Sequence, residues 1–199
     1  MKSAEIELKF PVSDPAALQS RLPRLGFHLE TPRTFELNTL YDTDTHKLRT
    51  ARQILRIRQY GNLCMVTHKR LPDDASADTR YKVRIETETT VADGHALAEI
   101  FQQLGYTPAF LYEKFRTEWS HTLEPSAHLV IDETPIGNYV ELEGPPEWID
   151  RTIVELGIDP ATCLTDSYGK LFLDWKARTG SPAEHLTFAA IPGPALTAR

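Results

Sequence analysis

The segment Ala4-Glu5-Ile6-Glu7-Leu8-Lys9-Phe10 alternates strictly between apolar and charged side chains. A period of two is typical of a β-strand, whose successive side chains point to opposite faces. The charged face of this strand carries Glu5, Glu7 and Lys9, which is two carboxylates followed by a cation. The solvent-exposed face of a half-buried strand commonly carries a more mixed set of polar residues. A face made only of charged residues is therefore unusual.

The same charged alternation recurs on later predicted strands. Its members are Arg56 and Arg58; Thr67 and Lys69; Arg80, Lys82, Arg84, Glu86 and Glu88; Lys114, Arg116 and Glu118; and Glu141 and Glu143, with Asp132 ending the strand before the last. Any one of these faces is explained most simply as the solvent side of an antiparallel sheet. Their repetition favours a closed barrel, in which the charged faces line the lumen and the apolar faces pack against helices.

A lumen that holds both acids and bases is costly unless its charges are paired or ligated. Hard cations such as Mg²⁺ and Mn²⁺ prefer oxygen ligands and are commonly shared between carboxylates and substrate phosphates. Arginine and lysine side chains would take the anionic part of such a ligand. The alternation therefore predicts a metal-bound polyphosphate inside the barrel.

Periodicity predicts one α+β domain over residues 1–176. Strands are expected at 4–10, 33–42, 53–60, 63–69, 80–90, 111–119, 127–132 and 138–143. Helices are expected after Asp14, after Asp93, after Pro146 and over residues 165–176. The segment 71–78 has the composition of a mobile loop, and residues 177–199 that of a flexible tail.

The bulk composition agrees with a single globular domain of 199 residues. The net charge of −6 argues against a nucleic acid polymer as a partner. Cys64 and Cys163 are isolated, which indicates reduced thiols, and no apolar run approaches the length of a membrane span. We therefore expect a cytoplasmic monomer or homodimer with no membrane partner.

Other phosphate and metal motifs are missing from the sequence. It contains no G-x-x-x-x-G-K-[ST] loop and no GxGxxG after a strand. The seven histidines are scattered without HxH or HExxH spacing, so a zinc site is not expected. Any phosphate must then be held by side chains of the strands.

The ordered set of charged strands resembles the CYTH superfamily, also called the triphosphate tunnel metalloenzymes. The segments that carry this resemblance are Glu5-Ile6-Glu7-Leu8-Lys9, which is similar to the family's ExExK motif, Leu55-Arg56-Ile57-Arg58, Lys69, Arg84-Ile85-Glu86, Lys114-Phe115-Arg116, Asp132, Glu141-Leu142-Glu143-Gly144 and Ser167-Tyr168. The resemblance spans residues 4 to about 173. The resemblance implies a closed eight-stranded antiparallel β-barrel, the triphosphate tunnel, with helices packed outside.

The resemblance also implies roles for individual residues. The expected ligands of one or two Mg²⁺ or Mn²⁺ ions are Glu5, Glu7, Asp132, Glu141 and Glu143. The expected triphosphate-binding residues are Lys9, Arg56, Arg58, Lys69, Arg84, Lys114 and Arg116, with Lys170 of the last helix as a further candidate. The expected catalytic residues are Glu7, Lys9 and Glu143. Glu86 and Glu88 are either further metal ligands or partners of the bases, and we expect the pairing.

Three functions are compatible with such a site. The first is a metal-dependent phosphohydrolase that acts on a small triphosphate, such as tripolyphosphate or thiamine triphosphate. The second is a class IV adenylate cyclase, which converts ATP to cyclic AMP and pyrophosphate, and the third is a non-catalytic module that binds polyphosphate or nucleotide. The complete set of candidate metal ligands favours an enzyme, and no adenine or ribose pocket can be assigned, so we expect the hydrolase.

Overall fold

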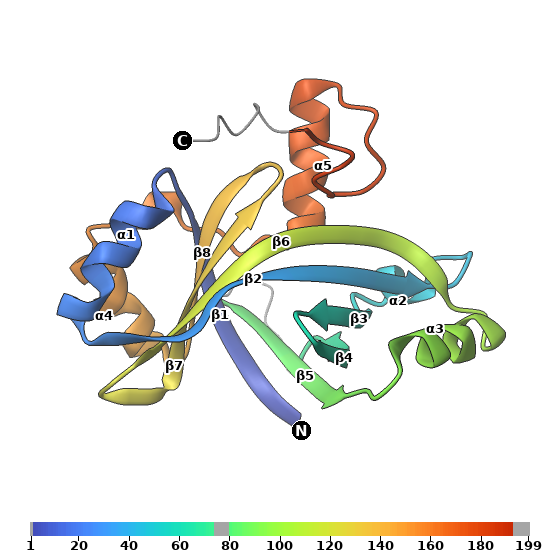
Figure 1. Ribbon diagram of the computed structural model, residues 1–199, viewed down its shortest axis with the longest axis horizontal. Coiled ribbons are helices and arrows are strands. Elements are labelled where there is room, and N and C mark those ends of the chain that lie inside the picture. Colours follow the sequence, from blue (N-terminus) through green and yellow to red (C-terminus); the bar gives the residue numbers. More distant parts are fainter. Residues whose placement is uncertain (1, 74–79, 193–199) are drawn as a thin grey trace.

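The computed structural model describes residues 2–73 and 80–192, and the eight strands of this part close into an antiparallel barrel (Figure 1). The strands are β1 (Lys2–Val12), β2 (Phe27–Asp42), β3 (Ile54–Tyr60), β4 (Leu63–Arg70), β5 (Lys82–Thr90), β6 (Thr107–His121), β7 (Glu124–Thr134) and β8 (Gly137–Glu143). Their order around the barrel is β1-β5-β4-β3-β2-β6-β7-β8. The predicted closed eight-stranded barrel is confirmed.

In the described part of the chain, five helices lie outside the barrel, of which the first three connect strands and the last two follow β8. They are α1 (Pro15–Arg21), α2 (Lys47–Thr50), α3 (Gly94–Gln103), α4 (Pro146–Leu156) and α5 (Tyr168–Thr179), with short 3-10 turns at Leu22–Leu25 and Pro160–Thr162. The side chains of Asp14, Asp93 and Ser167 accept hydrogen bonds from backbone amides of the first turns of α1, α3 and α5. These caps satisfy amides that have no partner within the helix, which explains where the helices begin.

Strand β2 is longer than the sequence predicts, because it begins at Phe27 rather than at residue 33. Its first part pairs with the far end of β6, and the pairing register shifts between Leu29 and Thr31 and again between Thr31 and Thr34. Such irregularities interrupt the alternation of side chains, which hides a strand from a pattern of period two.

The pairing register places the charged residues on the inner face. Glu7 lies opposite Glu143, and Lys9 lies opposite Glu141. Directly opposed residues of neighbouring strands point to the same side of a sheet. Around the barrel the same rule brings onto the inner face Arg84 and Glu86 of β5, Lys69 of β4, Arg56 and Arg58 of β3, Glu36 and Asn38 of β2, Lys114 and Arg116 of β6, and Asp132 of β7.

The main hydrophobic core lies between the outer face of the barrel and helices α1 and α4, which lie together at one end of the molecule (Figure 1). Phe10, Val140 and Leu142 from the strands are fully buried there, together with Leu22 and Ile149 from the helical side. The apolar half of each alternating strand thus faces helices, which leaves the charged half inside the barrel.

A second cluster closes one end of the barrel. Tyr112 lies on the inner face of β6, two residues before Lys114, and packs with Tyr168 and Phe172 of α5. The segment after α5 completes this cluster with Leu186, which is fully buried. α5 and this segment therefore cover the barrel end, beside strands β6 and β8 (Figure 1).

The prediction of a flexible tail from residue 177 is wrong for residues 177–192. Leu186 donates its amide to Leu111 of β6 at 3.0 Å and accepts the amide of Glu113 at 2.8 Å, so the segment pairs with the barrel. Residues 193–199, and positions 74–78 of the predicted mobile loop, lie outside the described residues. Within the described ranges, the helices are all too short or too polar to cross a lipid bilayer.

Candidate active site

A cavity of about 510 Å³ lies inside the barrel. Its lining is dominated by charged side chains and consists of Glu5, Glu30, Glu86, Glu88, Glu118, Glu143, Arg58, Lys69, Arg116, His128, Thr89, Thr90, Met65 and Val130. This described lining includes no residue of α5 or of its aromatic cluster, so the cavity lies away from the closed end. Its volume is in the range of small-molecule sites, and its charges suit a ligand with phosphate groups.

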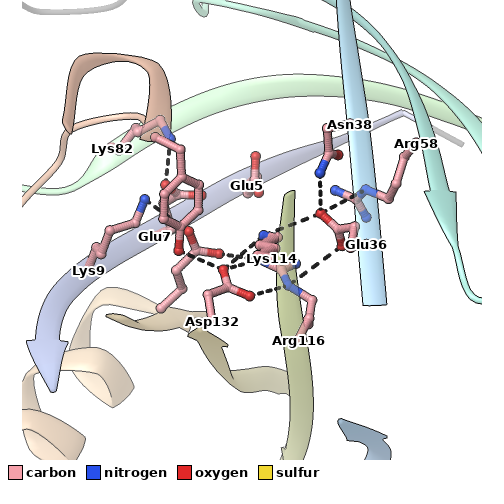
Figure 2. Close-up of polar contacts among 12 residues, drawn as sticks. Glu5, Glu7, Lys9, Glu36, Asn38, Arg58, Lys82, Lys114, Arg116 and Asp132 are labelled. Carbon is pink, nitrogen blue, oxygen red and sulfur yellow. Dashed lines mark hydrogen bonds and ion pairs between the residues drawn. The ribbon is translucent and has the colours of Figure 1, made fainter. Parts of the chain in front are cut away.

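Asp132 binds two bases in the deep part of the barrel near the closed end, which we call the floor and which includes Glu36, Lys114 and Arg116 (Figure 2). Its fully buried carboxylate accepts hydrogen bonds from Lys114 Nζ at 2.8 Å, from Arg116 at 2.7 and 2.8 Å, and from Tyr168 Oη at 2.7 Å. Burial and the neighbouring carboxylates raise the pKa of Tyr168 well above its usual range, so the phenol keeps its proton and donates. Because protein donors already occupy both oxygens, this environment favours a supporting role for Asp132 over the predicted metal ligand.

Lys9 lies beside this group and is only 1% exposed. Its Nζ forms an ion pair with Glu141 at 3.0 Å, donates to the backbone oxygen of Asp166 at 3.1 Å, and lies 3.9 Å from the centre of the Tyr168 ring. Glu141 also accepts from Arg116 at 2.7 Å. Although burial opposes ionisation, these cations hold the pKa of Glu141 well below its usual range, so this carboxylate is charged.

Lysines of β4 and β5 hold the two carboxylates of the first strand. Lys69 Nζ lies 2.7 Å from Glu5 and 2.9 Å from Glu86. Lys82 Nζ lies 2.5 Å from Glu7. Both glutamates of the ExExK segment are therefore paired with a cation of another strand.

Arg56 is buried in the opposite wall of the barrel. Its guanidinium donates to Tyr112 Oη and to Thr67 Oγ1, each at 3.1 Å. Glu86 and Glu88 lie 3.9 and 3.7 Å from the same guanidinium. The expected pairing of these two glutamates with the bases is confirmed.

Glu36 and Asn38 of β2 contribute a buried acceptor that sequence reasoning missed. Both residues are fully buried, and Asn38 Nδ2 donates to Glu36 Oε1 at 2.7 Å. Lys114, Arg116 and Arg58 surround the same carboxylate at 3.4, 3.8 and 3.8 Å (Figure 2). The local signal for these two residues is their alternation with the apolar Phe35 and Leu37 in β2, which marks the inner face of the strand. Lys82 and Tyr112 were also not assigned to the site.

The carboxylates nearest the cavity fit a divalent cation by their chemistry. Glu7 and Glu143 face one another across β1 and β8, and Glu5 precedes Glu7 on the same inner face. Burial raises the pKa of Glu143 to about 7, and the negative charges of Glu5 and Glu7 add to the shift. A bound cation would relieve the unfavourable ionisation of a buried carboxylate that lies beside other carboxylates, as Glu143 does. In the described part of the chain, no group of three or more acidic, His or Cys side chains forms a ready-made metal site, and Lys69 and Lys82 hold two of the candidates.

The barrel brings together every predicted site residue except Lys170. Arg84 shares the inner face with the other bases, opposite Glu5. Lys170 lies on the exposed side of α5, where its Nζ pairs with Asp174. The prediction of Lys170 as a phosphate ligand is wrong, because the position of the helix aims Tyr168 rather than Lys170 into the barrel.

Fold and site together define a tunnel-like β-barrel with an interior of paired acids and bases. A model of the CYTH domain matches residues 3–151, so the chain belongs to the CYTH family. No curated protein matches the chain.

Solved structures share the same fold at low sequence identity. The PH1819 protein of Pyrococcus horikoshii OT3 is 21% identical, with a TM-score of 0.70, and the match covers 86% of this chain and 99% of that one. A candidate adenylate cyclase from Vibrio parahaemolyticus is 16% identical, with a TM-score of 0.67 and coverages of 85% and 97%. HpAC1 from Hippeastrum, a candidate adenylyl cyclase reported to have a dominant triphosphatase activity, is 19% identical, with a TM-score of 0.59 and coverages of 88% and 96%. At these identities the likeness shows the fold alone.

Proposed function

We propose that this protein is a divalent-metal-dependent phosphohydrolase that acts on a small triphosphate, such as tripolyphosphate or thiamine triphosphate. The observation that carries the proposal is the composition of the cavity, where Arg58, Lys69 and Arg116 face a group of carboxylates that includes Glu5 and Glu143. Bases in such a place bind phosphate oxygens, and the acids hold the cations that phosphoryl transfer requires.

The bases bind and orient the substrate in this proposal. Arg58, Lys69 and Arg116 reach the cavity and would contact phosphate oxygens first. Lys9 and Lys114 lie deeper, held by Glu141 and Asp132, and would receive the innermost phosphate. Because these cations are positioned before the substrate arrives, little reorganisation is needed when negative charge develops in the transition state.

Glu5, Glu7 and Glu143 would hold Mg²⁺ or Mn²⁺, with Glu141 close behind them. When bound, such an ion supplies neutralisation of phosphate charge and activation of a water molecule for attack on phosphorus. The lysines that pair with Glu5 and Glu7 would then be released towards the phosphates. Lys69 and Lys82 would thus neutralise the glutamates in the ligand-free protein and the phosphates in the complex.

The cavity favours hydrolysis over cyclisation. Adenine recognition usually needs an apolar or aromatic surface on which the base can stack. Among the described lining residues only Met65 and Val130 are apolar, and the only ring is the imidazole of His128, with no Phe, Tyr or Trp. The triphosphatase activity reported for HpAC1, a protein of the same fold, also supports this choice. A class IV adenylate cyclase and a binding module without catalysis are the alternatives.

Product analysis separates these three functions. The protein is incubated with Mg²⁺ or Mn²⁺ and with tripolyphosphate, thiamine triphosphate or ATP, and the products are identified. We expect release of orthophosphate that stops when a chelator removes the metal. Cyclic AMP with pyrophosphate would instead identify a cyclase, and tight binding without turnover would identify a binding module.

Glu7→Gln tests the placement of the metal within the same assay. We expect the variant to lose metal-dependent turnover, because Glu7 lies opposite Glu143 and supplies one of the proposed ligands. The fold should persist, since the amide can still accept a hydrogen bond from Lys82. Glu155→Gln on the exposed side of α4 is the control for loss of one carboxylate. Turnover of Glu7→Gln near the wild-type rate contradicts the assignment.

A further inference from the structure

We infer that Glu36 is a positioning residue, whose carboxylate holds Arg58, Lys114 and Arg116 in place while leaving them free to bind phosphate. This inference rests on the proposed function, because it assigns Glu36 a part in the binding of the same substrate. None of the charged motifs of the sequence includes Glu36, and it does not line the cavity itself. Its role follows from where β2 places it.

Glu36 is fixed firmly in the floor of the barrel. It is fully buried, and the amide of Asn38, two residues along β2, donates to Oε1 at 2.7 Å (Figure 2). Asn38 is itself fully buried, so neither side chain has room to move. Oε2 has no hydrogen-bond donor in the described part of the chain.

The distances from Glu36 to the bases differ from those made by Asp132. Asp132 accepts hydrogen bonds of 2.7 to 2.8 Å from Lys114 and Arg116. These bonds occupy N–H groups of both side chains. The same two cations lie 3.4 and 3.8 Å from Glu36, and Arg58 also lies at 3.8 Å. Hydrogen bonds to a carboxylate are shorter than this, so Glu36 attracts the bases mainly by charge and does not use the N–H groups that Asp132 leaves unpaired.

A buried negative charge is needed at this point. Three cations around one site repel one another strongly in a medium of low dielectric constant. Although burial opposes ionisation, Lys114, Arg116 and Arg58 hold the pKa of Glu36 well below its usual range, so Glu36 is charged at neutral pH. Its charge offsets part of the repulsion until a phosphate arrives.

Arg58 depends most on Glu36. Glu36 is the sole ion-pair partner of Arg58 among the described residues, whereas Lys114 and Arg116 also have Asp132. Arg58 lines the cavity, and its buried Nε has no described hydrogen-bond acceptor. Loss of the Glu36 charge should therefore free Arg58 to adopt other orientations, and it should also make the floor more positive.

These two effects predict a split between binding and turnover in Glu36→Gln. We expect kcat for tripolyphosphate to fall about tenfold or more, because the bases no longer align the substrate. We expect the Kd of a non-hydrolysable imido analogue of tripolyphosphate, measured with Mg²⁺ by calorimetry, to fall about threefold or more, because one buried negative charge has gone. Glu36→Asp keeps the charge and should return this Kd to the wild-type value, with kcat between the two.

Glu133→Gln is the matched control. Its carboxylate pairs with Arg33 outside the tunnel, so it removes one charge from β7 without touching the floor. We expect its kcat and Kd to equal those of the wild type. A wild-type kcat in Glu36→Gln overturns the inference. A lower kcat together with weaker binding of the imido analogue also overturns it, because that result indicates a general disruption of the bases around Glu36.

Two further outcomes are also decisive. If Glu36→Gln does not fold, Glu36→Asp decides, since lowered kcat at unchanged Kd supports the inference and wild-type kcat overturns it. If the wild-type protein hydrolyses no triphosphate, the proposed function fails. The Kd comparison between Glu36→Gln and the wild type then still tests the role of Glu36 in binding the anion.

Discussion

Glu143 has an electrostatic environment that sets it apart from the other carboxylates of β1 and β8. Glu5, Glu7 and Glu141 each form an ion pair, whereas no cation of the described residues pairs with Glu143. Burial and the nearby carboxylates raise the pKa of Glu143 to about 7. An acid that resists ionisation in this way costs stability when it is forced to ionise.

We therefore expect Glu143→Gln to stabilise the metal-free protein at high pH. In the unfolded chain the carboxyl group has an ordinary pKa of 4.5, whereas in the folded protein it keeps its proton until about pH 7. The folded state binds more protons between these values, so the stability from protonated Glu143 is present below pH 4.5 and is lost as the pH rises through 7. Relative to the variant, the wild type should lose up to about 3 kcal/mol across this window.

Urea unfolding in EDTA at pH 5 and pH 8 measures this difference. The advantage of Glu143→Gln should be small at pH 5 and large at pH 8. Addition of Mg²⁺ should remove the advantage, because only the wild type retains all the proposed ligands. An advantage of equal size at both pH values would contradict the environment assigned to Glu143.

At the scale of elements, α5 and the segment after it decide that one end of the barrel is closed. Tyr168 reaches Asp132 from the first turn of α5, and Phe172 packs one turn later. The following segment adds a hydrogen-bonded pairing to β6 through Leu186. The bases at the floor are thus shielded from water on the side opposite the cavity, which strengthens their interactions with a bound anion.

Leu186→Ala tests whether this segment belongs to the folded domain. Leu186 is fully buried, so its truncation should lower the free energy of unfolding by about 2–5 kcal/mol. Leu173→Ala is the control, because Leu173 lies on the exposed side of α5, is 49% exposed and should change stability by less than about 0.5 kcal/mol. Denaturant unfolding measures both variants. Equal midpoints would mean that the segment contributes nothing to the fold.

The sequence predicts the barrel well because alternation with a period of two is a local signal. The central parts of β1, β3 and β5 carry this signal, and polar caps mark the helix starts at Asp14 and Asp93. The segment after α5 has no such signal. It contributes isolated buried side chains and a few backbone hydrogen bonds, so its composition alone resembles that of a tail.

The sequence predicts which residues belong to the candidate site, but it does not predict which of them form ion pairs with one another. Lys9, Arg56 and Glu141 were found because each lies at an inward position of an alternating strand. Their partners depend on the register between strands that are far apart in the sequence, and no local pattern specifies that register. Glu36 was missed for a related reason, since a single acid within β2 gains its meaning only from the bases of β3 and β6.

At the scale of the whole molecule, the interior of the barrel balances its own charges in the absence of ligand. Lys69 holds Glu5, and Lys82 holds Glu7. These pairs join the groups proposed for phosphate to the groups proposed for metal. Each ligand must therefore break an ion pair to bind, and the partner released by one ligand becomes available to the other. Binding of metal and of triphosphate should favour one another for this reason.

Lys82→Met tests this competition with a single ligand. Without phosphate, we expect the variant to bind Mn²⁺ about fivefold more tightly than the wild type, because a partly buried ion pair worth about 1 kcal/mol no longer competes for Glu7. Titration of the metal-free protein with Mn²⁺, followed by electron paramagnetic resonance, measures the affinity. Lys47→Met on the exposed surface removes the same charge from the molecule as a whole and should leave the affinity unchanged. If both variants tighten binding equally, net charge rather than the Lys82–Glu7 pair governs metal binding; if Lys82→Met weakens it, Lys82 does not compete with the metal at all.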